Sequence, residues 1–514
     1  MRKSSGFAMT CLVVAGALYS APPAFAGPES CAERVNNTQE KLLECVTIEG
    51  VRGHQAALQE AADANGGIRE TGTPGYDASV MYVLETLEAA GYAPELNAFD
   101  FTYLPPAILR QTAPIGAVYE SGFFTGSGYG AVEGQVIGVD LALGSGAWPN
   151  DPASSTSGCE AGDFSGLDFS GPADIALVQR GACFFSVKAV NAESAGAEAV
   201  IIFNQGNSPA RTGLIVGNAS ALPDGSPSNL TIPVVGASFA DGTALSQASS
   251  SAFVQVDPPV ETTQYNVIAE LPGKNSSNVV MAGAHLDSVR AGPGIQDNGS
   301  GSAAILETAV QMAKVKPFNT VRFAWWGGEE QGLVGSTAYV NGLSEEQQND
   351  VALYLNFDMI GSPNHVFFIY DGDDSDGTGA GPGPGGSDQI EYLFESYYSQ
   401  IGQPFKGTDF SGRSDYGPFI AVGIPAGGLF TGAEGIKTAD EVALWGGVAG
   451  EQYDPCYHLA CDTFDNVNLE ALAINSDAVA YSVLQFGMNT EAVNAERGKG
   501  NFKMPPEEPG LSVE

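Results

Sequence analysis

Residues 279–302, VVMAGAHLDSVRAGPGIQDNGSGS, begin with an apolar run that ends at His285 and Asp287. A turn-rich segment follows and leads through Asp297 into a Gly/Ser-rich, helix-like pattern. A buried strand that ends in an imidazole and a carboxylate, followed by a second carboxylate on a loop, is how α/β proteins present ligands at a sheet edge. Such side chains suit a metal ion such as zinc. The simpler alternative is that His285 and Asp287 only end a strand and that Asp297 begins a helix.

Strand-like and helix-like patterns alternate on both sides of this stretch. Before it, residues 46–64 and 80–90 predict helices, and residues 93–104 alternate as a strand does. This alternation predicts an α/β fold with a mixed, largely parallel central sheet flanked by helices. Further strands are expected at 265–271, 320–326, 351–357, 365–370 and 424–430, and further helices at 300–315, 334–341, 389–401, 416–421 and 469–486.

The segment between these two parts has a different character. After Pro105 and Pro106, residues 107–259 are rich in Gly, Ser, Val and Ile, with short strand patterns, and they contain no histidine. Helix patterns appear there only at 185–195 and 240–248. We expect a β-rich accessory domain without chemistry of its own.

At 514 residues the chain is too long for one compact core. Its first residues are typical of a secretory signal peptide: basic Arg2 and Lys3, an apolar core at residues 9–19 and the cleavage pattern Ala-Phe-Ala at residues 24–26. We expect residues 1–26 to be removed and the mature chain to begin at Gly27. The apolar run is too short to span a bilayer, and no later stretch is longer. The sequence therefore predicts a secreted protein, extracellular or periplasmic, without a membrane segment.

Cysteine usage agrees with export. Cys11 lies in the predicted signal peptide, and an even set of six remains, which suggests disulfides in an exported protein. Many pairings are possible, but proximity in the sequence favours Cys31 with Cys45, Cys159 with Cys183, and Cys456 with Cys461.

The formal charge is −39, and it becomes −41 once Arg2 and Lys3 are lost with the signal peptide, which contains no acidic residue. Such a charge argues against nucleic acid as a partner and disfavours anionic membranes. It suits a soluble protein and is compatible with cation binding.

Three predicted strands end in residues of the same kind. His285 ends the first, Glu329 and Glu330 follow the second, and Asp358 follows the third. The carboxyl ends of neighbouring parallel strands lie side by side, so we expect these side chains to converge with Asp297 on the intervening loop.

A second histidine is expected to complete this group. His54 lies in an amphipathic helix pattern and His365 opens a predicted strand, and both positions are more often structural. His458 lies in the short loop DPCYHLACD, which a disulfide between Cys456 and Cys461 would hold rigidly. We therefore select His458.

Several long motifs occur in order along the chain: AGAHLDSV (282–289), GIQDNGSGSAAILETA (294–309), RFAWWGGEEQGLVGS (322–336), LNFDMIGSPN (355–364), GRSDYGPF (412–419), GGLFTGA (427–433) and CYHLACD (456–462), with ADIALVQRGACFF (173–185) and SAGAEAVIIFN (194–204) in the accessory segment. They resemble the secreted bacterial di-zinc aminopeptidases of the aminopeptidase S and aminopeptidase Y type over about residues 46–103 and 264–486, and the accessory segment is similar to the protease-associated (PA) domain often inserted in this family. The resemblance implies a discontinuous peptidase domain of the zinc exopeptidase fold at 27–103 and 263–490 and a PA-like domain at 104–262.

The two ends of the chain are interpreted from their own residues. The signal peptide is expected at 1–26, and residues 491–514 lack apolar periodicity, so we expect a flexible tail there.

The resemblance implies two zinc ions per chain. His285 and Asp358 would hold one ion, Glu330 and His458 would hold the other, and Asp297 would bridge both. Two imidazoles and three carboxylates nearly neutralise two divalent cations, and a bridging carboxylate sets the short separation of such ions.

Further roles follow from the same resemblance. Glu329 would be the general base that takes a proton from the attacking water and later gives it to the leaving amine. Tyr457 would donate to the developing oxyanion, and Asp287 would accept the second ring N–H of His285. A cis peptide bond would follow the bridging residue, between Asp297 and Asn298.

The resemblance also implies how this chain would recognise its substrate. Asp358 and Glu329 place negative charge where a free α-amino group would bind, and Arg413 resembles the family arginine that contacts the substrate main chain. Met359 and Phe430 resemble residues of an apolar side-chain pocket, which implies a preference for Leu, Phe or Met. The expected substrates are the N-termini of peptides or proteins, cleaved by a monomeric enzyme.

Two alternatives stay open at this point. A carboxypeptidase on the same scaffold would need a basic pocket for the substrate carboxylate, and the catalytic segments are poor in arginine. A catalytically inactive receptor or binding module would have lost metal ligands, whereas all five ligands and the base are present here.

Overall fold

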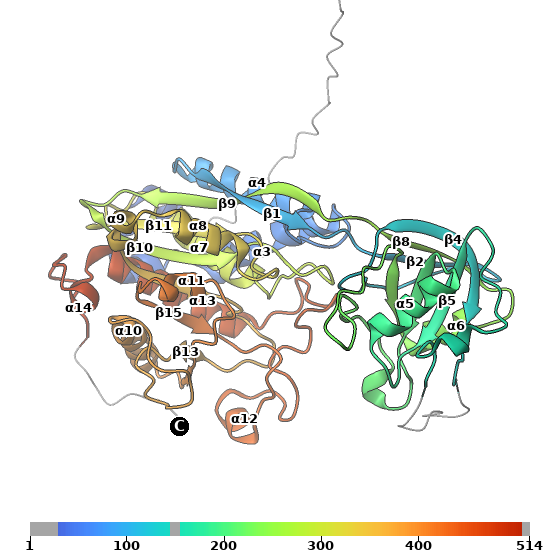
Figure 1. Ribbon diagram of the computed structural model, residues 1–514. Coiled ribbons are helices and arrows are strands. Elements are labelled where there is room, and N and C mark those ends of the chain that lie inside the picture. Colours follow the sequence, from blue (N-terminus) through green and yellow to red (C-terminus); the bar gives the residue numbers. More distant parts are fainter. Residues whose placement is uncertain (1–28, 144–154, 506–514) are drawn as a thin grey trace, which may run out of the picture. The chain divides into compact units, whose positions relative to one another are not determined.

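A computed structural model describes residues 29–143 and 155–505 (Figure 1). The predicted signal peptide lies outside the described residues. The chain divides into two compact units. The discontinuous unit joins Met1–Phe101 to Thr262–Glu514, and the inserted unit is Thr102–Glu261.

An eight-stranded mixed sheet lies at the centre of the discontinuous unit, in the order β1-β9-β11-β10-β12-β15-β13-β14. Strand β10 pairs in parallel with β11 and β12, and β12 pairs in parallel with β15. Strands β9 and β13 run antiparallel to β11 and β15. This is the mixed, largely parallel sheet that the sequence predicts. Its strands are β1 (Glu95–Tyr103), β9 (Val260–Leu271), β10 (Asn275–His285), β11 (Asn319–Trp326), β12 (Val351–Phe357), β13 (Phe368–Tyr370), β14 (Lys406–Thr408) and β15 (Ala426–Phe430).

Helices cover both faces of this sheet (Figure 1). Val280 and Ala282 of β10 pack into one buried cluster with α3, α7 and α13, whereas Val279 and Met281 face a second cluster with α8 and α11. Burial on both faces explains why β10 is an unbroken apolar run in the sequence. The helices of the unit are α1 (Glu29–Glu33), α2 (Gln39–Leu43), α3 (Ile48–Asp63), α4 (Pro74–Ala90), α7 (Gly299–Met312), α8 (Val334–Gly342), α9 (Glu345–Asp350), α10 (Ser387–Ile401), α11 (Gly417–Ala421), α12 (Ala439–Trp445), α13 (Leu469–Met488) and α14 (Glu491–Asn494).

The inserted unit has a sheet and a core of its own. Seven strands form the sheet in the order β3-β2-β8-β4-β5-β6-β7, and buried apolar clusters lie on its two faces. Its β-rich character agrees with the accessory domain expected from composition. The elements are β2 (Ile108–Ala113), β3 (Ala117–Tyr119), β4 (Gly130–Gly138), β5 (Asp174–Gln179), α5 (Phe185–Ala195), β6 (Ala199–Phe203), β7 (Val234–Ala237), α6 (Phe239–Leu245) and β8 (Ser251–Val256), with short 3-10 turns at Ala161–Phe164 and Pro209–Arg211.

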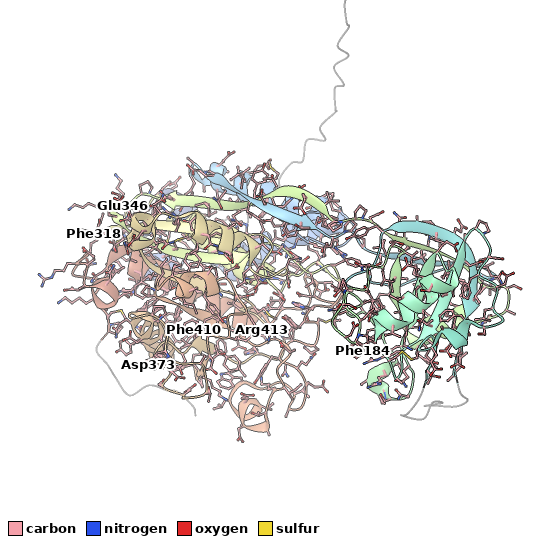
Figure 2. The ribbon with its side chains drawn as sticks, in the orientation of Figure 1. Phe184, Phe318, Glu346, Asp373, Phe410 and Arg413 are labelled. Carbon is pink, nitrogen blue, oxygen red and sulfur yellow. A yellow bond between two sulfur atoms is a disulfide. The ribbon has the colours of Figure 1, made fainter. Side chains whose placement is uncertain are left out.

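Three disulfides join the six cysteines of the described residues in the pairs that proximity favours. They connect Cys31 to Cys45, Cys159 to Cys183 and Cys456 to Cys461, with Cα–Cα distances of 5.6, 5.8 and 5.3 Å. The second is followed directly by the exposed Phe184 of the inserted unit (Figure 2). The third closes the loop that carries His458.

Residues 491–505 differ from the flexible tail expected at 491–514, whose last residues, 506–514, lie outside the described residues. Residues 491–494 form α14, and Phe502 is buried in the main core of the discontinuous unit. The side chains of Gln485 and Asn489 both donate to the carbonyl oxygen of Phe502. One buried aromatic side chain and two hydrogen bonds hold this segment in place, although it lacks the periodicity by which a core element is recognised.

Acidification should destabilise the discontinuous unit in part through His365. Burial and the nearby ammonium of Lys437 lower the pKa of this imidazole from 6.5 to about 4. Between pH 6.5 and about 4 the folded protein therefore keeps this imidazole neutral, whereas the unfolded chain protonates it. The contribution of His365 to the free energy of unfolding is complete above pH 6.5, and roughly 2 kcal/mol of it is lost as the pH falls towards 4. Urea unfolding of the metal-free protein at pH 7 and 4.5 should show that the free energy of unfolding decreases more for the wild type than for His365→Gln. Equal losses would contradict this role.

Candidate metal centre

The carboxyl ends of three neighbouring strands bring the predicted ligands together. Strand β10 ends at His285, whose register partner on β11 is Trp326, and Glu330 follows β11 by one tight turn. Asp358 is the first residue after β12, on the other side of β10. The parallel register thus fixes which side chains meet at this edge.

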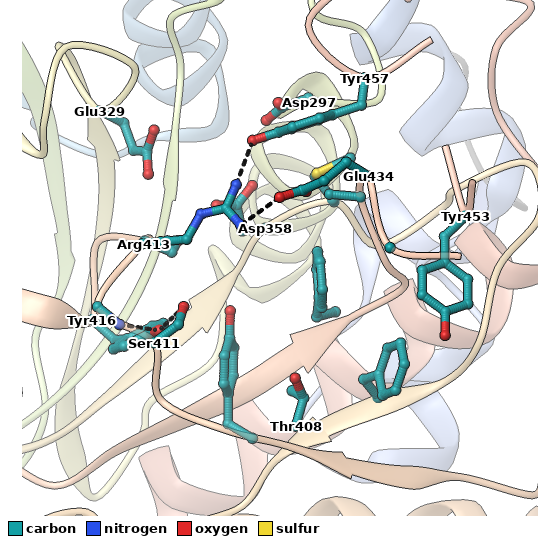
Figure 3. A pocket seen from close by; sticks show the side chains of 18 of the residues that line it. Asp297, Glu329, Asp358, Thr408, Ser411, Arg413, Tyr416, Glu434, Tyr453 and Tyr457 are labelled. Atoms are coloured by element: carbon teal, nitrogen blue, oxygen red, sulfur yellow. Dashed lines mark hydrogen bonds and ion pairs between the residues drawn. The ribbon is translucent and has the colours of Figure 1, made fainter. Parts of the chain in front are cut away.

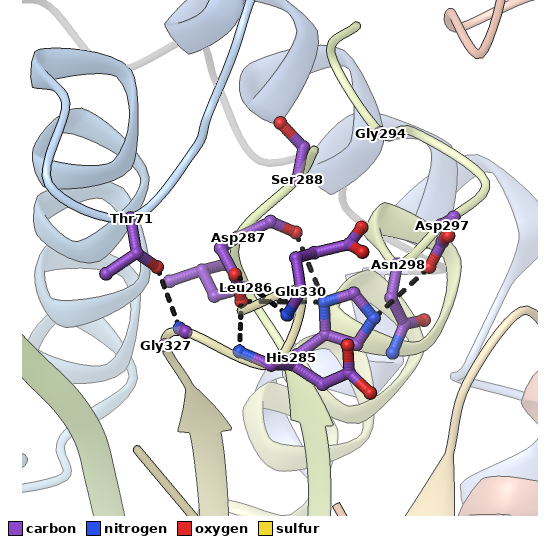
Figure 4. A network of polar contacts seen from close by, with 12 residues as sticks. Thr71, His285, Leu286, Asp287, Ser288, Gly294, Asp297, Asn298, Gly327 and Glu330 are labelled. Carbon is purple, nitrogen blue, oxygen red and sulfur yellow. Dashed lines mark hydrogen bonds and ion pairs between the residues drawn. The ribbon is translucent and has the colours of Figure 1, made fainter. Parts of the chain in front are cut away.

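Asp297 reaches the same edge from the loop between β10 and α7 (Figure 4). A cis peptide bond joins Asp297 to Asn298, as the family resemblance implies. Asn298 is the N-cap of α7: its side-chain oxygen accepts the N–H of Gly301, and its amide donates to the carbonyl oxygen of Phe357. The cap therefore ties the beginning of α7 to the end of β12, next to Asp358.

The carboxylate of Asp297 lies between the two imidazoles. Its Oδ1 is 3.2 Å from Nε2 of His285, and its Oδ2 is 3.2 Å from Nε2 of His458. On the first side, Oδ1 of Asp358 is 3.3 Å from His285 Nε2. On the second side, Oε2 of Glu330 is 3.0 Å from His458 Nε2. The geometry therefore gives two groups of side chains that share one carboxylate, which we call the two half-sites, and the side chains are grouped as the family resemblance implies.

The donor set fits divalent cations. The side chains of His285, Asp297 and Glu330 are almost completely buried, and such a concentration of carboxylates is costly in a protein interior without positive charge. Among the described residues, Oε1 of Glu330 and Oδ1 of Asp358 have no hydrogen-bond partner although they are buried. Imidazole nitrogens and carboxylate oxygens are suitable ligands for a borderline metal ion.

Protons neutralise these groups when no cation does. Burial lowers the pKa of His458, but hydrogen bonds to Asp297 and Glu330 outweigh it and raise the pKa to about 10. Burial lowers the pKa of His285 too, and the charges of Asp358 and Glu329 raise it well above its ordinary value. Burial also raises the pKa of Glu330 to about 7. Divalent cations would displace the protons of the imidazoles, so metal binding and proton release are linked here.

The loop of His458 is held by several contacts. The disulfide between Cys456 and Cys461 encloses it, and His458 has a left-handed backbone with φ of 57°. The ring of Tyr457 stacks on the imidazole with centroids 3.8 Å apart. The other two described candidates lie elsewhere, since His54 contacts Tyr82 and Glu307, and the ring of His365 packs against Phe367.

Asp287 and Glu329 lie directly beside the ligands. One ligand atom each from His285, Glu329 and Asp358 lie within 4.8 Å of one another, and burial raises the pKa of Glu329 well above its ordinary value. The completely buried Asp287 contacts His285 differently from our expectation. Nδ1 of His285 is 3.2 Å from the backbone oxygen of Asp287 and 3.6 Å from its carboxylate. The carboxylate instead accepts the backbone N–H groups of Glu329 and Glu330, because the tight turn after β11 points them towards it (Figure 4).

A cavity of about 640 Å³ opens onto this group of side chains (Figure 3). Met359 and Phe430 line it, as expected for an apolar pocket, together with Leu333 and Phe368. Arg413 lines it too. Its guanidinium donates to the hydroxyl oxygen of Tyr457 at 3.1 Å and to Glu434 at 2.7 Å.

Two residues of the site were not recognised from the sequence. Ser414 donates its hydroxyl to Oδ2 of Asp358 at 2.6 Å, and Glu434 pairs with Arg413. Both lie in or directly after quoted motifs, GRSDYGPF and GGLFTGA, but a serine and an exposed glutamate have many ordinary roles. Only the folded arrangement shows which atoms they contact.

Comparisons with known proteins agree with the fold and with the family resemblance. The chain matches peptidase family M28 over residues 266–483 and the PA domain over residues 140–245. It is 47% identical over 465 residues to an aminopeptidase of Pseudomonas aeruginosa, which covers 88% of this chain and 84% of the relative. The solved aminopeptidase from Aneurinibacillus sp. strain AM-1 is similar with a TM-score of 0.54 at 26% identity, covering 92% of this chain and 99% of that one. BSAP, a zinc aminopeptidase from Bacillus subtilis, is similar in fold with a TM-score of 0.57 at 24% identity, covering 84% and 93%. Since nearly half of the residues are identical along most of both chains in the first comparison, this protein belongs to peptidase family M28 and carries a PA domain in addition to its peptidase domain.

Proposed function

We propose that this protein is an exported aminopeptidase that binds two zinc ions and removes large apolar residues from the N-termini of peptides. The observation that carries the proposal is the position of Asp297, with one carboxylate oxygen 3.2 Å from each of two imidazoles. The names of its relatives support the reaction, and that of the Bacillus subtilis enzyme supports zinc.

The site offers ligands for two ions. His285 and Asp358 would hold the first, His458 and Glu330 the second, and Asp297 would bridge them. When bound, such ions polarise a carbonyl group and make water more acidic. Ser414 orients the carboxylate of Asp358 through its hydroxyl, as ligand carboxylates are commonly held.

The side chains of the protein would move the protons. Glu329 takes a proton from the attacking water and delivers it to the leaving amine, because its carboxylate is buried beside Asp358 and its raised pKa suits a base that later acts as an acid. Asp287 holds the backbone of Glu329 and Glu330, so the base and the ligand keep their spacing. The hydroxyl of Tyr457 accepts from Arg413, and its own proton remains available for the developing oxyanion.

Negative charge at the closed end of the cavity favours a substrate with a free amine. Asp358 and Glu329 line the cavity beside the ligands, whereas Met359 and Phe430 offer apolar surface for the first side chain. Arg413 is the only arginine or lysine among the described residues that line this cavity, and Glu434 neutralises it. A carboxypeptidase would need an unpaired cation for the substrate carboxylate, so aminopeptidase action is favoured.

Two features support the proposed action outside the cytoplasm. The first residues have the pattern of a signal peptide, and disulfides persist in oxidising compartments. Within residues 29–143 and 155–505, no helix is long and apolar enough to cross a membrane. The charge of −39 disfavours nucleic acid and anionic lipid as partners.

A panel of substrates tests the function directly. We expect the purified protein to cleave leucine p-nitroanilide faster than the alanine and glutamate analogues, and to leave N-acetyl-leucine p-nitroanilide and a C-terminal carboxypeptidase substrate intact. A chelator should abolish the activity, and added zinc should restore it. Cleavage of the blocked or C-terminal substrate would contradict the proposal, as would activity that survives removal of all metal.

Replacing the base should separate chemistry from metal binding. Glu329→Gln keeps the shape of the side chain but cannot accept a proton, so kcat should fall by roughly 10²–10⁴ while the zinc content is unchanged. Glu346→Gln on α9 makes the same change at an exposed position that does not line the cavity and should leave kcat unaltered. Near-normal turnover by a zinc-loaded Glu329→Gln enzyme would exclude the role of Glu329 as general base.

A further inference from the structure

Asp462 is a buried acid that the proposed reaction does not use. It is 2% exposed and lies four residues after His458, next to Cys461 of the disulfide. Its carboxylate reaches the loop between β10 and α7, residues 286–298, which we call the bridging loop. Oδ1 accepts the backbone N–H of Gln296 at 2.8 Å, and Oδ2 accepts the backbone N–H of Asp297 at 3.0 Å.

We propose that Asp462 positions the carboxylate of Asp297 for both metal ions; this inference rests on the proposed two-metal site. A carboxylate that accepts two adjacent N–H groups fixes the peptide plane from which the Asp297 side chain projects. Two hydrogen bonds of 2.8 and 3.0 Å to neighbouring N–H groups restrict the rotation of that plane. The side chain of Asp297 must direct one oxygen to each imidazole. A carboxylate that bridges two ions depends more on its orientation than a carboxylate that binds a single ion does.

The rest of the bridging loop is held independently by Arg69. This fully buried guanidinium donates to the carbonyl oxygens of Leu286, Pro293 and Gly294, and the backbone N–H of Arg69 donates to the hydroxyl oxygen of Ser288. A backbone bond from Ile295 N–H to the carbonyl oxygen of Asp462 also remains whatever side chain residue 462 carries. Shortening or neutralising Asp462 should therefore leave the loop folded and free only the peptide next to the bridging residue.

Asp462 also connects the two metal half-sites. Asn466 donates to Asp462 and to Asp454, and Asp454 accepts the N–H of Cys456. The loop that presents His458 is thus tied, through Asp462, to the backbone of Asp297. A displacement of one half-site would be transmitted to the other through these bonds.

Zinc affinity of the metal-free protein distinguishes positioning from a structural role. We expect competition with a chromophoric chelator to give a zinc dissociation constant about 10- to 100-fold larger for Asp462→Asn than for the wild type, because the asparagine side chain keeps only one acceptor oxygen. The dissociation constant of Asp462→Ala should be larger still. Asp465→Asn removes the same charge three residues away at an exposed position and should bind zinc as the wild type does. Thermal unfolding of the same metal-free samples should show all variants folded; if Asp462→Ala fails to fold, Asp462→Asn carries the test.

The outcomes separate this inference from the proposed function. The positioning role alone would be overturned if the zinc dissociation constants of the wild type and of a folded Asp462→Asn variant agreed within twofold. Wild-type protein that binds no zinc would overturn the two-metal site and this inference with it. Weakened binding in Asp462→Asn with unchanged binding in Asp465→Asn would support the role of Asp462.

Discussion

The site depends on a single carboxylate that faces two imidazoles at once. Asp297 is 3.2 Å from His285 on one side and from His458 on the other, and the remaining acids are arranged around that pair. So many carboxylates in a buried space are unfavourable unless positive charge neutralises them, by protons or by metal ions. Packing of the sheet and helices therefore offsets the free-energy cost of holding these like charges close together at one edge of the sheet.

That arrangement requires segments far apart in the sequence. Strand β10 supplies His285, the turn after β11 supplies Glu329 and Glu330, the proposed base and a proposed ligand, and a disulfide-closed loop near the end of the domain supplies His458. Arg69, which precedes the PA domain, is bonded to the same loop as Asp297. The PA domain is thus inserted between two parts of the chain that must both be folded for the metallo-peptidase site to form.

Much of this could be predicted because the relevant signals are strong. The central strands of the sheet and the helices α5 and α8 have the hydrophobic periodicity and composition typical of strands and helices, and the predicted ligands follow strand ends within long motifs. Short or weakly apolar elements such as α9, α12 and β14 were not predicted, because tertiary contacts rather than local periodicity stabilise them. Helix α4 begins at Pro74, six residues before the helix expected at 80–90, since a proline also fits the first turn of a helix. The partners of Asp287 could not be predicted, because they are backbone N–H groups, whose direction no side-chain pattern reports.

The central claim is that Asp297 bridges two metal ions, and anomalous X-ray diffraction of zinc-loaded crystals tests it most directly. Data collected at the zinc absorption edge should show two peaks roughly 3.5–4 Å apart, one on each side of the Asp297 carboxylate, and Asp297→Asn crystals should lose or weaken at least one. A single peak in the wild type, or two peaks with Asp297 bound to only one of them, would contradict the account.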